Sequence, residues 1–194
     1  MNTVLMIRNR FGRRALLLGS VGAALLLAFR FRAGADQVSA ATDGPVTIVH
    51  FTDAGTRQDS VTVPKVVKSD DEWQKQLAQD SYEVARQAGT ESPGSGALLN
   101  EHDKGVFRCI CCDNALYSSD TKFESGTGWP SFWAPIAEEN VTKIEDSSFG
   151  MTRIAVSCTL CDAHLGHVFD DGPQPTGLRY CMNSVSMRFA KAMA

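Results

Sequence analysis

The spacing of hydrophobic and polar residues changes along this chain near residue 105. From there to the carboxyl end, short β-branched, aromatic and apolar runs are separated by turn residues, a pattern typical of short strands. Five such runs predict strands, at residues 106–108, 115–117, 152–156, 167–169 and 184–189. The stretch 171–177 holds two glycines and two prolines and predicts a long turn. We therefore expect this part of the chain to be mainly β.

Two further strand-forming runs precede residue 65. Residues 46–52 and 60–63 are rich in β-branched side chains, and a turn-prone Asp53-Ala54-Gly55 follows the first run. They predict a small β-hairpin that extends the main domain.

Two short helices are predicted between this hairpin and residue 105. Residues 69–72 form a capping box with acidic side chains in the first turn, which predicts a helix that runs to Gln79. Asp80 is expected to cap a second helix at 82–87, and Gly89 is expected to end it.

The first thirty-five residues have the pattern of a targeting segment. Arg13-Arg14 precede an apolar stretch at 15–29, and the small residues 33–35 offer a cleavage site. The Arg-Arg-x-Leu-Leu pattern is similar to a twin-arginine signal and predicts export to the periplasm. The apolar stretch would span only about 22 Å, less than a hydrocarbon core of about 30 Å. An uncleaved membrane anchor is the alternative; after cleavage we expect no stable membrane insertion.

Removal of this segment changes the charge balance. The whole chain has a formal net charge of -3, but six of its nineteen basic residues lie in the first thirty-five positions, which hold no acid. The remainder carries thirteen basic and twenty-two acidic residues, a net charge of -9. Phosphate backbones repel a protein of this charge, so we expect no nucleic-acid partner.

Four of the six cysteines form two Cys-x-x-Cys pairs, Cys109/Cys112 and Cys158/Cys161. Thiolates three residues apart can both reach one Zn²⁺ at about 2.3 Å, and two such pairs complete a tetrahedral shell. Four protein ligands leave no position open for a reacting water, so the single Zn²⁺ is expected to be structural. The alternatives are two redox disulfides or buried free thiols.

A fifth cysteine, Cys181, lies twenty residues after the second pair and points to nucleophilic chemistry. Arg179 would favour its thiolate form, and His164 and His167 can titrate near neutral pH. Each residue also has an ordinary structural interpretation. The histidines could be exposed or packed in a core, and Arg179 could pair with an acid such as Asp171.

Three ordered segments give the chain a family resemblance. Residues 125–133 (Ser-Gly-Thr-Gly-Trp-Pro-Ser-Phe-Trp), 164–169 (His-Leu-Gly-His-Val-Phe) and 177–184 (Gly-Leu-Arg-Tyr-Cys-Met-Asn-Ser) resemble methionine sulfoxide reductase B. The resemblance implies two antiparallel sheets in a zinc-held β-tent, with short helices at the amino-terminal end. It also implies reduction of the R epimer of methionine sulfoxide, in oxidised proteins or as the free amino acid.

The resemblance implies catalytic roles for four residues. Cys181 would attack the sulfoxide and become a sulfenic acid, and His167 would be the proton donor. His164 and Asn183 would orient groups and hold the oxygen. A thiol must then reduce the sulfenic acid.

The resemblance further implies an apolar wall for the substrate. Trp129, together with Phe169, would contact the S-methyl group and help to select one epimer. The alternative for Trp129 is a core anchor, an interpretation that suits Trp133 better.

One position departs from the family pattern. Thr127 stands where many members carry a resolving cysteine. A threonine cannot form a disulfide, so the common intramolecular route of regeneration is not available here. A thioredoxin-like partner would then reduce the sulfenic acid directly, or Cys111 would substitute after a loop movement. Cys111 lies between two expected metal ligands, where it is otherwise a small apolar filler.

These patterns together predict three parts of the chain. They are a signal peptide at 1–35, a linker with a small β extension at 36–68, and a catalytic domain at 69–194. The rival interpretation is a zinc-stabilised binding module, which would need the four metal ligands but not Cys181, His167 and Asn183.

Overall fold

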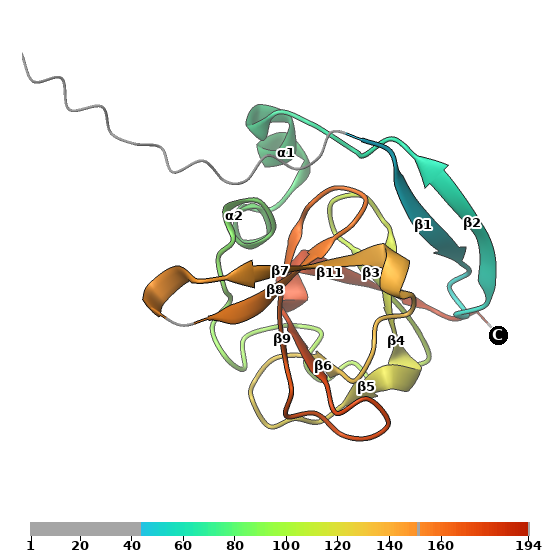
Figure 1. The fold of residues 1–194 in the computed structure, drawn as a ribbon, viewed down its shortest axis with the longest axis vertical. Helices are drawn as coiled ribbons and strands as arrows, with labels where there is room; N and C mark the ends of the chain where they lie inside the picture. Colours follow the sequence, from blue (N-terminus) through green and yellow to red (C-terminus); the bar gives the residue numbers. More distant parts are fainter. Residues whose placement is uncertain (1–43, 151, 194) are drawn as a thin grey trace, which may run out of the picture. The chain divides into compact units, whose positions relative to one another are not determined.

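A computed structural model of the chain describes residues 44–150 and 152–193. Within this part, eleven strands and two α-helices form two larger antiparallel sheets, a two-stranded hairpin and a short helical region (Figure 1). The mainly β fold with two antiparallel sheets is confirmed. The expected signal peptide at 1–35 lies outside the described residues.

The larger sheet has six strands and contains the carboxyl-terminal cysteine at its centre. Its spatial order is β5 (Lys122–Phe123), β6 (Ser131–Phe132), β10 (Arg179–Met182), β9 (His164–Phe169), β8 (Arg153–Cys158) and β7 (Val141–Asp146). Because β10 enters between β6 and β9, Cys181 is paired with Ser131 on one side and with His167 on the other.

The smaller sheet has three strands, β11 (Met187–Lys191), β3 (Gly105–Cys109) and β4 (Ala115–Ser118). Aromatic side chains fill the space between the two sheets. Phe132 of the larger sheet stacks on Tyr117 at 4.4 Å between ring centroids and meets Phe107 edge-on at 4.9 Å. All three rings are fully buried, so their removal from water stabilises the packing of one sheet on the other.

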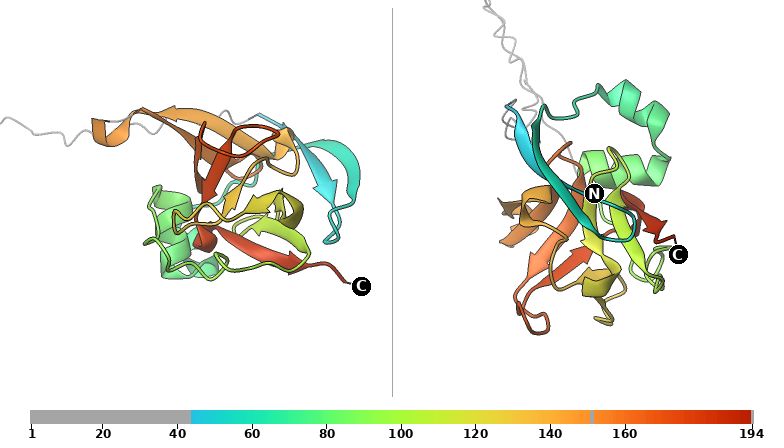
Figure 2. Two further views of the ribbon diagram at one scale, coloured as in Figure 1. Left: turned by 90° about the horizontal axis from the view of Figure 1, so that it is seen from below. Right: turned by 90° about the vertical axis from the view of Figure 1, so that its right-hand side faces the viewer.

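In the left-hand view of Figure 2, the two helices, α1 (Asp70–Gln76) and α2 (Gln79–Gln87), lie at one end of the sheets and the hairpin lies at the other. The predicted capping box is confirmed. The Ser69 hydroxyl accepts from the Glu72 amide, and the Glu72 carboxylate accepts from the Ser69 amide at 2.8 Å. α1 stops three residues before the expected Gln79 because Leu77 is extended.

The expectation that Asp80 caps the second helix is wrong. α2 begins at Gln79, and its N-cap residue Ala78 provides no side-chain hydrogen bond. Asp80 therefore lies in the first turn, where its carboxylate accepts from the Ser81 amide at 2.7 Å. The helix ends at Ala88, whose φ of 53° is left-handed, directly before the expected Gly89.

The predicted amino-terminal hairpin is present as β1 (Val46–Phe51) and β2 (Arg57–Val63). A fully buried side chain, Asn140, joins it to the rest of the fold. The Asn140 Oδ1 accepts from the Val49 amide at 2.7 Å, and Nδ2 donates to the carbonyls of Val49 and Ala115, both at 2.8 Å. The hairpin is thus hydrogen-bonded to β4 through one amide side chain.

The expected strand at 184–189 is only partly correct. Residues Ser184–Ser186 form a 3-10 turn, and β11 starts at Met187. This turn carries the chain from β10 of the larger sheet to β11 of the smaller sheet. The sequence pattern also missed β5, β6, β7 and β10, because β5 and β6 have two residues each, β10 has only four, and β7 contains several polar side chains.

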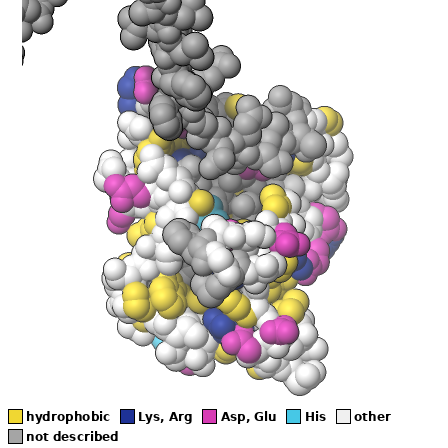
Figure 3. Space-filling view, turned by 60° about the vertical axis from the view of Figure 1, so that its left-hand side comes forward, with side chains coloured by type: hydrophobic (Ala, Val, Ile, Leu, Met, Phe, Trp, Pro, Cys, Tyr) yellow, Lys and Arg dark blue, Asp and Glu magenta, His cyan; other side chains and the backbone are white. Residues whose placement is uncertain are grey.

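No helix among the described residues is long and apolar enough to cross a membrane. On the face shown in Figure 3, acidic side chains lie beside basic ones, with hydrophobic side chains scattered among them. Exposed ion pairs such as Lys191–Asp103 occur among the described residues, and pairs of this kind contribute little to stability.

Replacement of Asn140 by alanine should lower the free energy of unfolding by about 2 to 3 kcal/mol, because two buried groups of Val49 lose their partner. Chemical denaturation of the metal-bound protein measures this change. Thr62→Ala, which removes an exposed threonine pair of the same hairpin, is the control. Equal stabilities of the two variants would show that Asn140 does not hold the hairpin.

Candidate active site and metal centre

The two Cys-x-x-Cys pairs lie in two hairpin turns with the same backbone geometry. One turn joins β3 to β4, and the other joins β8 to β9. In the first, the Asp113 amide donates to the Cys109 carbonyl at 2.9 Å; in the second, the Asp162 amide donates to the Cys158 carbonyl at 2.9 Å. Each turn therefore closes after its second cysteine and directs both thiols to one side.

Both turns require a left-handed residue directly after the second cysteine. Asp113 has a φ of 67° and Asp162 a φ of 58°. Aspartate tolerates this conformation better than most residues, which explains the shared Cys-Asp step in the two pairs. Lys65 donates to the Asp162 carboxylate at 2.7 Å and covers the second turn.

The four thiols converge on one point between the two sheets. All four Sγ atoms lie within 4.8 Å of one another, with Cys109 to Cys161 and Cys112 to Cys158 both at 3.6 Å. Thiolates around a tetrahedral ion with bonds of about 2.3 Å are separated by about 3.8 Å. The cluster is therefore close enough to hold one metal ion, and its all-sulfur ligand set suits zinc.

A pocket of about 120 Å³ surrounds the half-buried thiol of Cys181, which lies outside the four-thiol cluster. It collects residues from distant parts of the chain, and its wall contains four other residues that the sequence suggested. The lining residues are Thr90, Trp129, Arg153, Gly166, His167, Phe169, Cys181 and Asn183.

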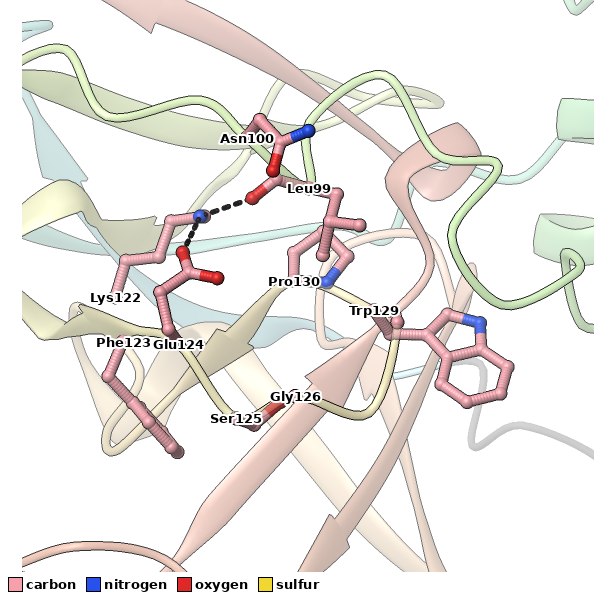
Figure 4. A pocket seen from close by; sticks show the side chains of 10 residues that line it. Leu99, Asn100, Lys122, Phe123, Glu124, Ser125, Gly126, Trp129 and Pro130 are labelled. Atoms are coloured by element: carbon pink, nitrogen blue, oxygen red, sulfur yellow. Dashed lines mark hydrogen bonds and ion pairs between the residues drawn. The ribbon is translucent and has the colours of Figure 1, made fainter.

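A larger pocket, of about 210 Å³, is not the candidate site (Figure 4). It lies beside Lys122, whose ammonium donates to the Leu99 carbonyl at 2.7 Å and pairs with Glu124 at 3.7 Å. The indole ring of Trp129 points away from this pair (Figure 4). No cysteine or histidine lines this second pocket, so the smaller one has the groups needed for thiol chemistry.

Cys181 has two opposing influences on its ionisation. Burial is the largest and raises the pKa of the thiol above its ordinary value. The Thr127 hydroxyl, 3.8 Å from the sulfur, and the positive charge of Arg179 act in the opposite direction. Burial prevails in the free protein, so the thiol is held largely protonated until something assists its ionisation.

Arg179 makes the ion pair that the sequence offered as its ordinary interpretation, and it also influences the thiol. Its guanidinium donates to both carboxylate oxygens of Asp171, at 2.9 and 2.8 Å. The same group lies over the Phe169 ring, 4.5 Å from the centroid. Arg179 does not line the pocket but fixes Phe169, which does.

A β-bulge places the two histidines on one side of β9. Residues three apart on a regular strand face opposite sides. Here β9 has one extra residue opposite Val156–Ser157, and the rings of His164 and His167 lie 5.4 Å apart. Gly166 is required beside this bulge, because a Cβ at that position would lie 2.1 Å from the Cys181 carbonyl oxygen.

The two histidines have different surroundings. His167 lines the pocket, and its Nε2 is 2.8 Å from a carboxylate oxygen of Asp146 on β7. His164 is buried behind it, and its Nε2 has no hydrogen-bond partner among the described residues. Burial, together with the neighbouring His167, lowers the pKa of His164 to about 4, so this ring is neutral at neutral pH.

Three charged residues that the sequence did not suggest support this pocket. The Asp146 carboxylate contacts His167 and also accepts from the Arg153 guanidinium at 2.8 Å. Hydrogen bonds from Ser148 and His167 hold the pKa of Asp146 well below its usual range. Glu91 contacts both Trp129 and Asn183 through its main chain. These contacts join residues far apart in sequence, so no local pattern indicates them.

Thr127, at the position of the family's resolving cysteine, and Cys111, its possible substitute, differ in their access to Cys181. Thr127 lies beside the thiol, as its 3.8 Å contact shows. Cys111 is 5% exposed and packs in the same buried core as Cys109 and Cys161 of the four-thiol cluster. A Cys111 thiol could leave that core only by disturbing the metal site.

Comparison with known proteins matches this geometry to one family. The sequence profile of the SelR domain matches residues 77–191. A peptide methionine sulfoxide reductase MsrB from Hahella chejuensis is 53% identical over 128 residues, which cover 66% of this chain and 92% of that relative. The protein of the same name from Methanosarcina barkeri is 56% identical over 124 residues, covering 64% of this chain and 87% of the relative.

A third relative, from Leptospira interrogans, is also a peptide methionine sulfoxide reductase MsrB; it is 53% identical over 127 residues, 66% of this chain and 97% of the relative. Fold and site together define a SelR-domain oxidoreductase with a pocket around Cys181 and a cluster of four thiols close enough to hold a metal ion. The chain belongs to the MsrB family of peptide methionine sulfoxide reductases. This assignment confirms the resemblance and favours an enzyme over the rival binding module.

The rate of Cys181 alkylation by iodoacetamide should rise with pH and report a pKa above the ordinary value of a cysteine thiol. Arg179→Met should raise this pKa further, because it removes a charge that stabilises the thiolate and leaves the Asp171 carboxylate unpaired. Each unit by which the pKa of Cys181 rises lowers the fraction of thiolate at neutral pH about tenfold. Mass spectrometry of the metal-bound protein over a pH series measures both rates.

Arg57→Met is the control for this experiment, because Arg57 is an exposed arginine on the hairpin that pairs with Glu139. Its profile should match that of the unmodified protein. Identical profiles for Arg179→Met and the control would contradict an electrostatic role for Arg179.

Proposed function

We propose that this protein reduces the R epimer of methionine sulfoxide to methionine, with Cys181 as the nucleophile. The family assignment supports the reaction, and the carrying observation is the pocket in which Cys181, His167, Trp129 and Asn183 meet. Protein-bound methionine sulfoxide is the substrate class, with the free amino acid as a smaller alternative. The reaction repairs oxidised methionine side chains.

In the first step the Cys181 sulfur attacks the sulfoxide sulfur while the sulfoxide oxygen takes up a proton. The oxygen passes to Cys181, which becomes a sulfenic acid, and methionine leaves. The substrate is reduced by two electrons and the cysteine is oxidised by two. The thiolate is the attacking form, so protonation of the sulfoxide oxygen and loss of the Cys181 proton must be coupled within the pocket.

His167 is the proton donor in this proposal, and Asp146 is the residue that orients it. The 2.8 Å contact with Asp146 fixes an N–H at the Nε2 of His167. The Nδ1 atom is then the one that passes a proton to the substrate when the ring is doubly protonated. His164, neutral at neutral pH, supports the His167 ring from behind and does not donate the proton.

Trp129 and Phe169 form the apolar part of the substrate pocket, and Asn183 holds the polar part. Both aromatic side chains line the pocket. An S-methyl group placed against them leaves the sulfoxide oxygen on the side of the polar residues. The S epimer would exchange these two positions, which disfavours its reaction.

A thioredoxin-like dithiol regenerates Cys181. One thiol of the partner attacks the sulfenic acid, which forms a mixed disulfide and releases water. The second thiol then releases Cys181 and leaves the partner as a disulfide. Support for this direct route comes from the threonine at position 127 and from the burial of Cys111 beside the metal cluster.

One Zn²⁺ held by Cys109, Cys112, Cys158 and Cys161 has a structural role in this proposal. With four thiolates from the chain, it supplies folding free energy and takes no part in sulfoxide chemistry. It joins the β3–β4 turn of one sheet to the β8–β9 turn of the other. Metal analysis that found less than one zinc per folded chain would contradict this assignment.

We propose export to the periplasm by the twin-arginine route, with a membrane anchor retained if the signal stays uncleaved. Support comes from Arg13-Arg14, the following apolar stretch and the small residues 33–35. Export of a folded protein suits a chain whose metal is bound before transport. Replacement of Arg13-Arg14 by two lysines should block export, and normal export of that variant would contradict the route.

Replacement of Cys181 by serine should lower sulfoxide reduction at least about a thousandfold while zinc content and melting temperature stay unchanged. An assay with separate R and S sulfoxides and a dithiol reductant measures both the loss and the epimer preference. Cys111→Ser is the matched control and should retain activity. Retained activity in the Cys181 variant would defeat the proposed function.

Thr127→Cys should introduce a working resolving thiol. The native hydroxyl is 3.8 Å from the Cys181 sulfur, so a thiol in its place needs only a small movement to form a disulfide. After one turnover without reductant, non-reducing peptide mapping should find a bridge between the introduced thiol and Cys181. A bridge between Cys111 and Cys181 in the unmodified protein would overturn the direct route.

A further inference from the structure

The segment between α2 and β3 has no helix or strand, yet it forms part of the pocket wall. Thr90 of this segment lines the pocket. The segment is held against the turn before β6, because the Gly94 amide donates to the Gly128 carbonyl at 2.8 Å. A Cβ at Gly128, whose φ is +92°, would lie 2.9 Å from Pro93, so the two backbones are in direct contact.

Glu91 makes four hydrogen bonds, each to a different group in or beside the site. Its amide donates to the Asn183 side-chain oxygen at 3.0 Å. Its carbonyl accepts from the indole N–H of Trp129 at 3.1 Å. The dipeptide Thr90–Glu91 therefore connects three residues of the pocket wall: Thr90 itself, Trp129 and Asn183.

The Glu91 side chain anchors this dipeptide to the other end of the site. Its two carboxylate oxygens accept from the amides of Ser184 and Val185, at 2.9 and 3.1 Å. These amides begin the 3-10 turn that follows Asn183. Hydrogen bonds to an ionised acceptor are roughly twice as strong as neutral ones, so the side chain holds the main chain of residue 91 in place.

The packing around the carboxylate leaves little freedom for another arrangement. A Cβ at Gly96 would lie 2.5 Å from a Glu91 carboxylate oxygen and 2.1 Å from the Ser184 hydroxyl oxygen. Asn183 is also fixed from the opposite direction, because its Nδ2 donates to the Leu165 carbonyl at 3.0 Å. The orientation of the Asn183 side-chain amide is therefore fixed by two hydrogen bonds, one at its nitrogen and one from the Glu91 N–H to its oxygen.

We infer that Glu91 is a positioning residue of the active site, which sets the relative placement of Trp129 and Asn183 and thereby selects the substrate epimer. This inference rests on the proposed function, because it concerns how that pocket binds its sulfoxide. Glu91 does not line the pocket. It acts through the indole, which contacts the methyl side of the substrate, and through the amide, which contacts the oxygen side.

Glu91→Gln tests the inference with little change in volume. A glutamine offers one acceptor oxygen but turns an NH₂ group toward the second backbone amide, where a donor meets a donor. Loss of this anchor should lower kcat/KM for the R sulfoxide about tenfold to a hundredfold, mainly through KM, and should reduce the preference for R over S. The alkylation rate of Cys181 should not change, since Glu91 does not contact that thiol.

Glu101→Gln is the matched control. Glu101 lies in the same irregular segment, and its carboxylate accepts from the Asp103 amide at 2.8 Å, outside the pocket wall. This variant should have the KM and the epimer preference of the unmodified protein. All measurements use the zinc-bound protein, with the melting temperature recorded for each variant.

The outcomes separate the inference from the proposed function. An unmodified protein that reduces neither epimer would refute the proposed function itself. An active protein whose Glu91→Gln variant matches the Glu101→Gln control in KM and epimer preference would overturn the inference alone. A fall in activity with an equal fall in Cys181 alkylation would also overturn it, because it would indicate general loosening of the site.

Glu91→Asp provides a second variant if the glutamine variant does not fold. It keeps the charge but shortens the side chain by one methylene, so it should also raise KM while preserving the metal site. Loss of the folded, zinc-bound state in both variants would show that Glu91 serves the folding of the domain, and the positioning role would be wrong.

Discussion

The convergence of four cysteine thiols between two β-hairpins is the constraint on which the rest of the structure depends. The β3–β4 turn belongs to the smaller sheet and the β8–β9 turn to the larger one, so a metal ion held by all four thiols would tie the sheets together at their turns. β9 begins at His164, three residues after Cys161. The second cysteine turn therefore fixes where β9 starts, and with it the positions of His164 and His167.

The candidate site depends on a second kind of constraint, the close pairing of β9 with β10. Gly166 allows the strands to approach where the bulge turns His164 and His167 to the same side. The two strands then present Cys181 and His167 as direct neighbours. Because these strands are central in a six-stranded sheet, Cys181 and His167 lie on rigid elements, whereas Trp129 and Asn183 come from segments outside the strands that hydrogen bonds hold in place.

Burial and charge oppose each other at the thiol, and this opposition suits the proposed chemistry. Burial raises the pKa of Cys181, which protects the thiol from oxidation, since the thiolate is the reactive form. Arg179 and the Thr127 hydroxyl partly offset that effect. The Asp171 carboxylate pairs with Arg179 and itself raises the pKa of the thiol. In the proposed reaction, the thiol therefore ionises as a bound substrate accepts a proton.

The pairing of the four clustered cysteines and the capping box at Ser69 could be predicted from the sequence, because both depend on spacing within a few residues. The structure decided what depends on contacts across the fold. Asp146 beside His167, Glu91 between Trp129 and Asn183, and the bulge in β9 all join segments that are distant along the chain. A sequence pattern records which residue types are present, but only the packed sheets determine which of them meet.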